Sequence, residues 1–248
     1  MNKQEQKFLR KVATKKPSKL EELIANKVPD KLQETLQVAF AKSFAIVFEK
    51  GTSVIEKSYN KEEIEHQHKV NAYSFSIKPD KKRIKAFERE VNKSENLNVL
   101  ISGAKGVGLG FLGVGLPDIP VFIAMVLKGI YQISMQYGYD YTKEEEKYFI
   151  LKLISTALSH GEDAVIGNEC INNFMKNNIL PSEHDFKIQI DEVSEILSTE
   201  LLYMKFVQGL PVVGVVGGLS DAVFVKKILS YAKLKYKQRF FEVQDWKY

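Results

Sequence analysis

The chain has 248 residues, of which 44% are hydrophobic and 27% charged, so it can bury a core and is not a disordered chain. Its only cysteine, Cys170, excludes an intrachain disulfide scaffold and fits a reducing compartment such as the cytosol. The net charge of +5 is unevenly distributed: residues 1–20 carry +6 and residues 226–248 carry +5, around an acidic middle. Basic ends attract polyanions such as anionic lipid, nucleic acid or an acidic partner.

Helical periodicity runs through most of the chain, and no segment alternates as a strand bounded by hairpin turns would. Pro29-Asp30 predicts a helix start with Asp30 as N-cap, and an apolar stripe continues from there to Phe48. Thr142 and Glu145 have capping-box spacing, which predicts a helix that starts at Thr142, runs through Leu158 and stops near Gly161. Further helices are expected at 80–99, 163–177 and 185–204. We therefore predict a single all-α domain over residues 29–248, preceded by a loosely attached basic extension, residues 1–28.

Two glycine-rich apolar segments, 103–135 and 206–225, are the most informative parts of the sequence. Each contains an apolar stretch with one charge, Asp118 or Asp221, of about the 20 residues that span a bilayer. Pro117 and Pro120 would interrupt a continuous helix, so we expect two short helices with Asp118 capping the second. The tetrads 115–118 and 218–221 resemble each other, which predicts two helical hairpins packed as a pseudo-repeat.

The glycines of these segments are spaced so that two helix backbones can approach closely. Three interpretations remain open: a tightly packed hairpin core, a segment that enters or faces the membrane, and a backbone that approaches a ligand at the break. The candidate residues for membrane or partner contact are Gly106, Gly110, Gly115, Asp118, Gly214, Gly218 and Asp221.

The C-terminal segment, residues 226–242, alternates basic and aromatic residues. Leu229, Ala232, Tyr236 and Phe240 form an apolar stripe at helical spacing, so the segment is expected to be a helix. Such a helix can pack on its own domain or lie at a membrane surface. The candidates for contact with an anionic surface are Lys233, Lys235, Lys237 and Arg239.

Three acids deserve consideration as metal ligands, Asp118, Asp221 and Asp140. If the two hairpins pack as a pair, Asp118 and Asp221 meet at one end of the bundle and can bind Mg²⁺ or Mn²⁺. The simpler interpretation is that the first two cap helices and that Asp140 belongs to a turn. No metal or nucleophile motif occurs, and we expect Cys170 to be buried rather than reactive.

Residues 103–140 carry a resemblance to a known family. The glycine-rich run, the Leu116–Pro120 break, the apolar helix after it and the string Tyr137–Asp140 resemble the signature of the EcsC protein family. The resemblance extends over roughly residues 30–242. The family is named for a bacterial member encoded beside an ABC transporter that influences protein secretion, and the resemblance implies a cytosolic protein at the membrane without a defined reaction.

We therefore expect a non-enzymatic, cytoplasmic accessory protein without a cofactor, peripheral to the inner membrane face or shallowly inserted in it. Its expected partners are anionic lipid and an integral membrane protein such as an ABC transporter, and not nucleic acid. The alternative is a divalent-metal-dependent hydrolase that uses Asp118 and Asp221.

Overall fold

Helices make up the regular structure of the chain. The computed structural model describes residues 3–13, 29–78, 80–94, 118–177, 180, 185–207 and 219–243, and no strand occurs among them. This confirms the predicted all-α fold. In chain order the elements are α1 (Lys3–Ala13), α3 (Asp30–Ile46), the π-helical turn η1 (Val47–Gly51), α4 (Thr52–Glu56), α5 (Lys61–Ile77), α6 (Lys81–Ser94), α8 (Asp118–Gln136), α9 (Glu144–Leu158), α10 (Gly161–Asn177), α11 (Phe186–Val207) and α12 (Leu219–Val243).

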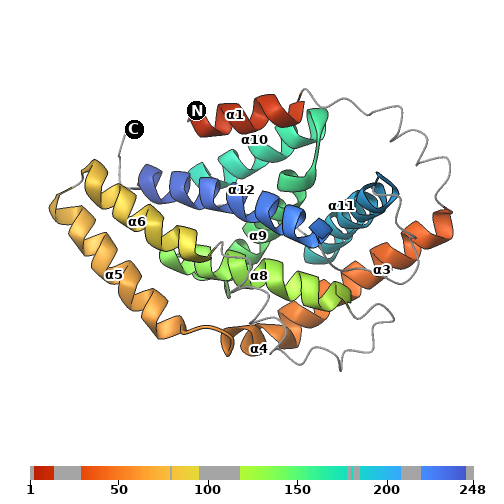
Figure 1. Ribbon diagram of the computed structural model, residues 1–248, viewed down its shortest axis with the longest axis horizontal. Coiled ribbons are helices and arrows are strands. Elements are labelled where there is room, and N and C mark those ends of the chain that lie inside the picture. The colour runs from red at the N-terminus through yellow and green to blue at the C-terminus, as the bar shows by residue number, and fades with distance from the viewer. Residues whose placement is uncertain are drawn as a thin grey trace.

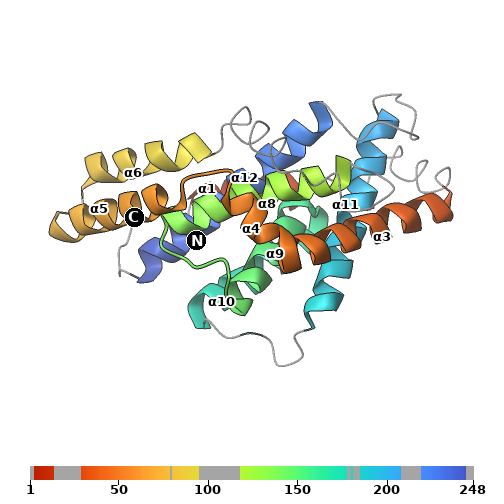
Figure 2. The ribbon, with the colours of Figure 1, turned by 90° about the horizontal axis from the view of Figure 1, so that it is seen from below.

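Helices α8, α9 and α12 form the centre of the molecule (Figure 1). α8 and α12 pack side by side, and α9 packs on α12. Around them, α1 and α10 cover one side, α3 and α11 pack together at one end of the long axis, and α5 and α6 form the other end (Figures 1 and 2). The centre is therefore enclosed by helices that are far apart in the sequence.

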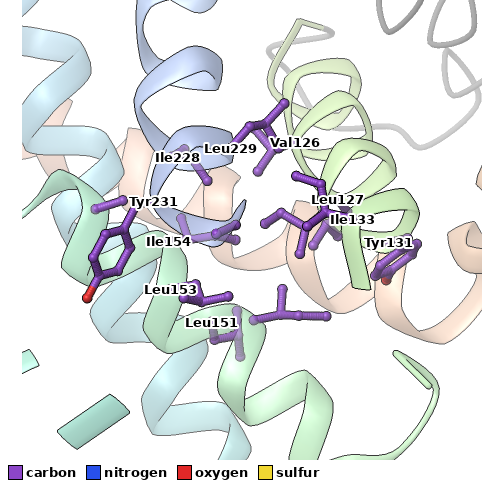
Figure 3. Close-up of a cluster of buried hydrophobic side chains, with 14 of the residues drawn as sticks. Val126, Leu127, Tyr131, Ile133, Leu151, Leu153, Ile154, Ile228, Leu229 and Tyr231 are labelled. Atoms are coloured by element: carbon purple, nitrogen blue, oxygen red, sulfur yellow. The ribbon is translucent and has the colours of Figure 1, made fainter. Parts of the chain in front are cut away.

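The core is formed where these three central helices meet (Figure 3). Leu127 and Ile133 of α8, Ile154 of α9 and Ile228 of α12 are fully buried and lie toward one another. Every residue from Phe122 to Met135 is buried, and α8 is largely apolar on all of its faces, with Lys128, Gln132 and Ser134 as polar exceptions. A helix that is apolar all round must be enclosed, either by protein or by lipid. Here it is enclosed by α3, α5, α6 and α12.

Residues 3–13 are part of this helical body, which corrects the expectation of a loosely attached extension. α1 packs on α10, and its Phe8 ring stacks on Tyr231 of α12 with the ring centroids 4.3 Å apart. Val12 and Glu5 are both buried. The contacts join residues more than 150 positions apart, and for that reason the local sequence pattern did not reveal them.

Most predicted helices occur close to their expected bounds, but two predicted caps are wrong. Asp30 is the first residue of α3, and Pro29 precedes it without a side-chain cap. α9 begins at Glu144 rather than Thr142, with Lys143 as N-cap residue and no side-chain cap hydrogen bond, so the predicted capping box does not form. The Thr142 hydroxyl instead donates to the Asp140 carboxylate over 2.6 Å, as part of the turn that precedes the helix.

The helix predicted to follow the break in the first glycine-rich segment begins where it was expected. α8 begins at Asp118, and Pro120 lies in its first turn, where proline is tolerated. The helix then continues for 19 residues to Gln136, longer than the short helix that we predicted. α12 likewise begins at Leu219, directly after Gly217-Gly218. The segments 101–117 and 208–218 lie outside the described residues, so the pseudo-repeat of two hairpins stays a prediction.

Three helices were not predicted at all, α1, α4 and α5. α5 begins with an N-cap, in which the Asn60 side chain accepts a hydrogen bond from the Glu63 amide over 3.1 Å. It buries only one side chain, that of Phe75. Cys170, which we expected to be buried, is exposed on α10.

The end of α8 is closed by a left-handed glycine. Gly138 has φ of 82°, its amide donates to the Met135 carbonyl, and the next amide, Tyr139, donates to Ser134. This pair of hydrogen bonds is a Schellman motif, which favours glycine at this position. The His68 ring lies directly over Gly138, where a Cβ would come within 2.5 Å of it. The Tyr137–Asp140 string of the family resemblance thus connects α8 to α5.

We predict that Gly138→Ala destabilises the fold more than Gly161→Ala. Both glycines have positive φ, at 82° and 58°, but no atom lies near the position of a Cβ at Gly161. Gly161→Ala should therefore cost only the left-handed penalty, about 1–2 kcal/mol, and Gly138→Ala about 1–3 kcal/mol more from the clash with His68. Urea denaturation of both variants measures the difference, and equal losses would contradict the close contact with His68.

Candidate functional site

The glycine-rich residues proposed for membrane or partner contact fall largely outside what the structure describes. Gly106, Gly110, Gly115, Gly214 and Gly218 all lie outside the described residues. Asp118 and Asp221 lie in the first turns of α8 and α12, but their side chains are outside the described part of the structure. Their proposed roles as contacts or metal ligands therefore stay predictions.

α8 and α12 run parallel, which brings their N-terminal turns to the same end of the core (Figure 1). Gly129 faces Leu229 so closely that a Cβ on it would lie 2.7 Å from a Leu229 methyl. Just after the C-terminal end of α8, the Tyr137 ring stacks on the Tyr236 ring of α12, with the ring centroids 6.5 Å apart. From the first contact to the second, residue numbers rise along both helices, so the helices are parallel. Asp118 and Asp221, in their first turns, therefore lie at the same end of two neighbouring helices.

Asp140, the third candidate metal ligand, is held in a turn. Its Oδ1 accepts hydrogen bonds from the Thr142 hydroxyl at 2.6 Å and the Thr142 amide at 3.0 Å. The Thr142 hydroxyl bond is the main cause that lowers the pKa of Asp140. No group of three or more His, Cys, Asp or Glu side chains that could hold a metal occurs among the described residues.

The C-terminal helix, predicted to present cations to an anionic surface, instead turns two of them inward. Lys235 is 0% exposed and donates to Glu5 Oε1 over 2.6 Å and to Asn172 over 2.7 Å. Gln238 donates to the second Glu5 oxygen over 3.0 Å, and Asn168 donates to the first over 2.9 Å. Lys235 thus serves to anchor α1, and we withdraw it from the candidate surface contacts.

Arg239 is the second inward cation, which corrects its assignment to the surface. It donates to Glu146 Oε2 over 2.7 Å, and the Tyr236 hydroxyl donates to the other Glu146 oxygen over 2.6 Å. The guanidinium also lies over the Tyr139 ring, 4.1 Å from its centroid. Burial raises the pKa of Glu146, although the Arg239 charge opposes that shift. This cluster connects α12 to α9.

Of the other two predicted surface cations, Lys237 pairs with Glu88 of α6, and both Lys233 and Lys237 are half-buried. Three cations of α12 at alternate positions therefore bind acids from three helices. Lys235 pairs with α1, Lys237 with α6, and Arg239 with α9.

A polar pocket of about 380 Å³ lies beside the turn between α8 and α9. Next to it, the Tyr59 hydroxyl donates to Tyr141, and both Tyr141 and Lys61 donate to Glu56. Burial raises the pKa of Tyr59 to about 12 and also raises the pKa of Tyr141. Both hydroxyls therefore stay protonated at neutral pH. The lining carries charges of both signs, which favours no single class of charged ligand: Lys61, Glu65, Lys69 and Asp140.

Exposed cations are concentrated on two helices, α1 and α6. α1 turns its acid, Glu5, into the core, and its exposed residues include Lys3, Lys7, Arg10 and Lys11. α6 pairs its Glu88 with α12, and its exposed residues include Lys82, Lys85 and Arg89. The basic face of α6 was not predicted from the sequence, although the i, i+3 and i+7 spacing of Lys82, Lys85 and Arg89 was a usable signal.

One described helix is long and apolar enough to cross a membrane. Ile119–Gln136 of α8 has a mean hydropathy of 1.3, but 89% of this stretch is buried inside the protein. It also carries the buried Lys128, whose ammonium donates to the Ser58 carbonyl over 3.3 Å. In this fold the segment is the central core helix, which favours the buried-hairpin interpretation for that part of the sequence.

We predict that Glu5→Gln destabilises the protein by about 3–5 kcal/mol, because it leaves the Lys235 charge buried without its counterion. The double variant Glu5→Gln/Lys235→Met removes both charges and should recover part of that loss. Guanidinium denaturation at pH 7 measures the three proteins. A double variant less stable than Glu5→Gln alone would contradict a coupled pair.

The same pair gives a second, pH-dependent measurement. Burial alone would raise the pKa of Glu5, but hydrogen bonds from Lys235, Asn172 and Asn168 outweigh it and lower the pKa from 4.5 to about 2. The stabilisation is thus complete above pH 4.5 and is lost as the pH falls toward 2. Wild type should lose stability across this interval, and Glu5→Gln should lose less.

The sequence matches the EcsC protein family over residues 1–241, nearly the whole chain. The match includes residues 1–28, in agreement with a body that contains α1. No curated protein and no solved structure matches the chain. With the family match covering the central helices and the Tyr137–Asp140 turn alike, the chain belongs to the EcsC protein family.

Proposed function

We propose that the protein is a membrane-associated accessory protein that docks from the cytosol on anionic lipid. The observation that carries this proposal is the separation of charge on the outer helices. α1 and α6 each expose several cations, while Glu5, the acid of α1, and Glu88 of α6 point to α12 and are paired there. A Lys or Arg near an anionic bilayer contributes about 1 kcal/mol, so several on one face suffice for reversible attachment.

The proposed attachment is peripheral. The most apolar described helix, α8, is enclosed by the other helices, so insertion of that helix would require the core to open. Family membership adds the expectation of an integral membrane partner, such as an ABC transporter, beside which the protein would work. The proposal involves no reaction and no cofactor.

Flotation with lipid vesicles tests this proposal directly. We expect the purified protein to float with vesicles that contain about a third anionic lipid at 50 mM salt, and not with neutral vesicles. Binding should fall strongly at 0.5 M salt, because exposed charges are screened within a few Å at that ionic strength. Failure to float with anionic vesicles at low salt would refute the proposal.

A competing function rests on the parallel packing of α8 and α12, which starts Asp118 and Asp221 on neighbouring helices. A hydrolase that uses both carboxylates would bind Mg²⁺ or Mn²⁺. Titration calorimetry with each ion should then give binding that Asp118→Asn abolishes and Asp140→Asn preserves. Absence of binding in the wild-type protein would remove this alternative.

A further inference from the structure

α5 exposes an apolar stripe that the core does not use. Val70, Tyr73 and Ile77 are 48%, 69% and 64% exposed, and their spacing of i, i+3 and i+7 places them on one face of the helix. The other exposed large hydrophobic residues of the described chain are dispersed over four helices: Val38, Ile166, Ile188 and Val223. α5 is therefore the described helix on which such residues gather.

The neighbouring helix α6 exposes a basic stripe at the same spacing. Lys82, Lys85 and Arg89 are exposed, and their i, i+3 and i+7 positions share one face. Residues 69–89 hold seven Lys or Arg and two acids, a net charge of +5. Both acids are engaged in ion pairs, Asp80 with Arg83 and Glu88 with Lys237. This stretch, the C-terminal half of α5 with most of α6, is therefore strongly positive, whereas the first turns of α5 carry the exposed acids Glu62, Glu63 and Glu65.

The hairpin is held firmly by its inner side, which leaves the two stripes facing outward. His68 Nδ1 lies 2.8 Å from the Gln136 carbonyl at the end of α8, and Phe75 and Phe87 pack against Phe240 of α12. Arg83 of α6 donates to Ser74 of α5 over 3.0 Å. The hairpin forms one end of the long axis of the molecule, where a flat surface can reach it (Figures 1 and 2).

We propose that the α5–α6 hairpin is the surface that contacts the anionic bilayer. Val70, Tyr73 and Ile77 enter the headgroup region, and Lys82, Lys85 and Arg89 bind the lipid phosphates. An interfacial helix gains affinity from buried apolar area together with attraction to anionic lipid, and this hairpin carries both on adjacent helices. α1 is basic but carries none of the exposed large hydrophobic residues, so it can supply only the electrostatic part. The inference rests on the membrane docking proposed above and names its face.

Charge reversal tests the basic stripe against a matched control. We expect K82E/K85E/R89E to lower the partition coefficient onto anionic vesicles at least tenfold at 0.1 M salt. The control K3E/K7E/R10E on α1 makes the same change in net charge and should lower it by less. A smaller effect of the α6 variant than of the α1 variant would overturn the assignment of the face.

Removal of the apolar stripe forms the second arm. V70S/Y73S/I77S should weaken the binding that survives at 0.5 M salt, whereas V38S/I166S/I188S, which alters three exposed hydrophobic residues elsewhere, should leave it unchanged. Circular dichroism and the thermal midpoint confirm that each variant is folded. Equal binding by the two serine variants would overturn the insertion of α5.

A fluorescent probe tests the same contact in a nearly unchanged protein. The chain has one tryptophan, Trp246, so Y73W in a W246F background reports on position 73 alone. Its emission should shift to the blue with anionic vesicles and be quenched by lipids brominated near the headgroup, while I188W in the same background should do neither. An unshifted Y73W signal on vesicle-bound protein would overturn the inference.

The outcomes separate this inference from the proposed function. If wild-type protein does not float with anionic vesicles, the membrane function itself fails. If wild type floats and the hairpin variants float equally well, the function stands and another face makes the contact. If the hairpin variants keep their binding to lipid and lose binding only to an acidic protein or a nucleic acid, a lipid-binding role for this face is likewise overturned.

Discussion

The three ion pairs on the C-terminal half of α12 are the interactions on which the arrangement of the outer helices depends. Lys235, Lys237 and Arg239 pair with Glu5 of α1, Glu88 of α6 and Glu146 of α9. Burial of a charge is costly unless a counterion and further hydrogen bonds compensate for it. A helix that supplies the counterion is therefore held in one position and orientation, which apolar contacts alone specify less strictly.

These pairs also decide which charges remain for function. The C-terminal segment is strongly basic in sequence, yet Lys235 and Arg239 are enclosed and Lys233 and Lys237 are half-buried. Two of the acids that pair with them, Glu5 and Glu88, come from the basic helices α1 and α6, and their inward orientation leaves cations of these two helices on the outside. The positive surface thus lies on the helices that α12 binds rather than on α12 itself.

The central helix α8 shows why composition does not distinguish a membrane span from a core helix. It is apolar on every face because α3, α5, α6 and α12 surround it, and lipid on every face would require the same composition. The smaller apolar surface that remains is on α5. The proposed contact of this surface with a membrane is supported by its position beside a basic helix rather than by its size.

Local sequence patterns were enough to predict the helical class, the family and most helix bounds in the well-patterned regions. Periodicity identified α3 and α9–α12, and Pro117 with Asp118 located the start of α8, because helix periodicity and proline breaks are local properties. Asp140 was correctly considered as a turn residue for the same reason.

Which charged side chains are buried could not be predicted in this way and depends on the three-dimensional packing. Lys235 and Lys233 belong to the same basic helix, but one is enclosed by Glu5 and Asn172 while the other is half-exposed. Glu5 lies 230 residues from Lys235, so no local pattern relates them. The attachment of α1 and the outward stripes of α5 and α6 follow from such distant contacts, because burial depends on what packs against a residue and not on its neighbours in the chain.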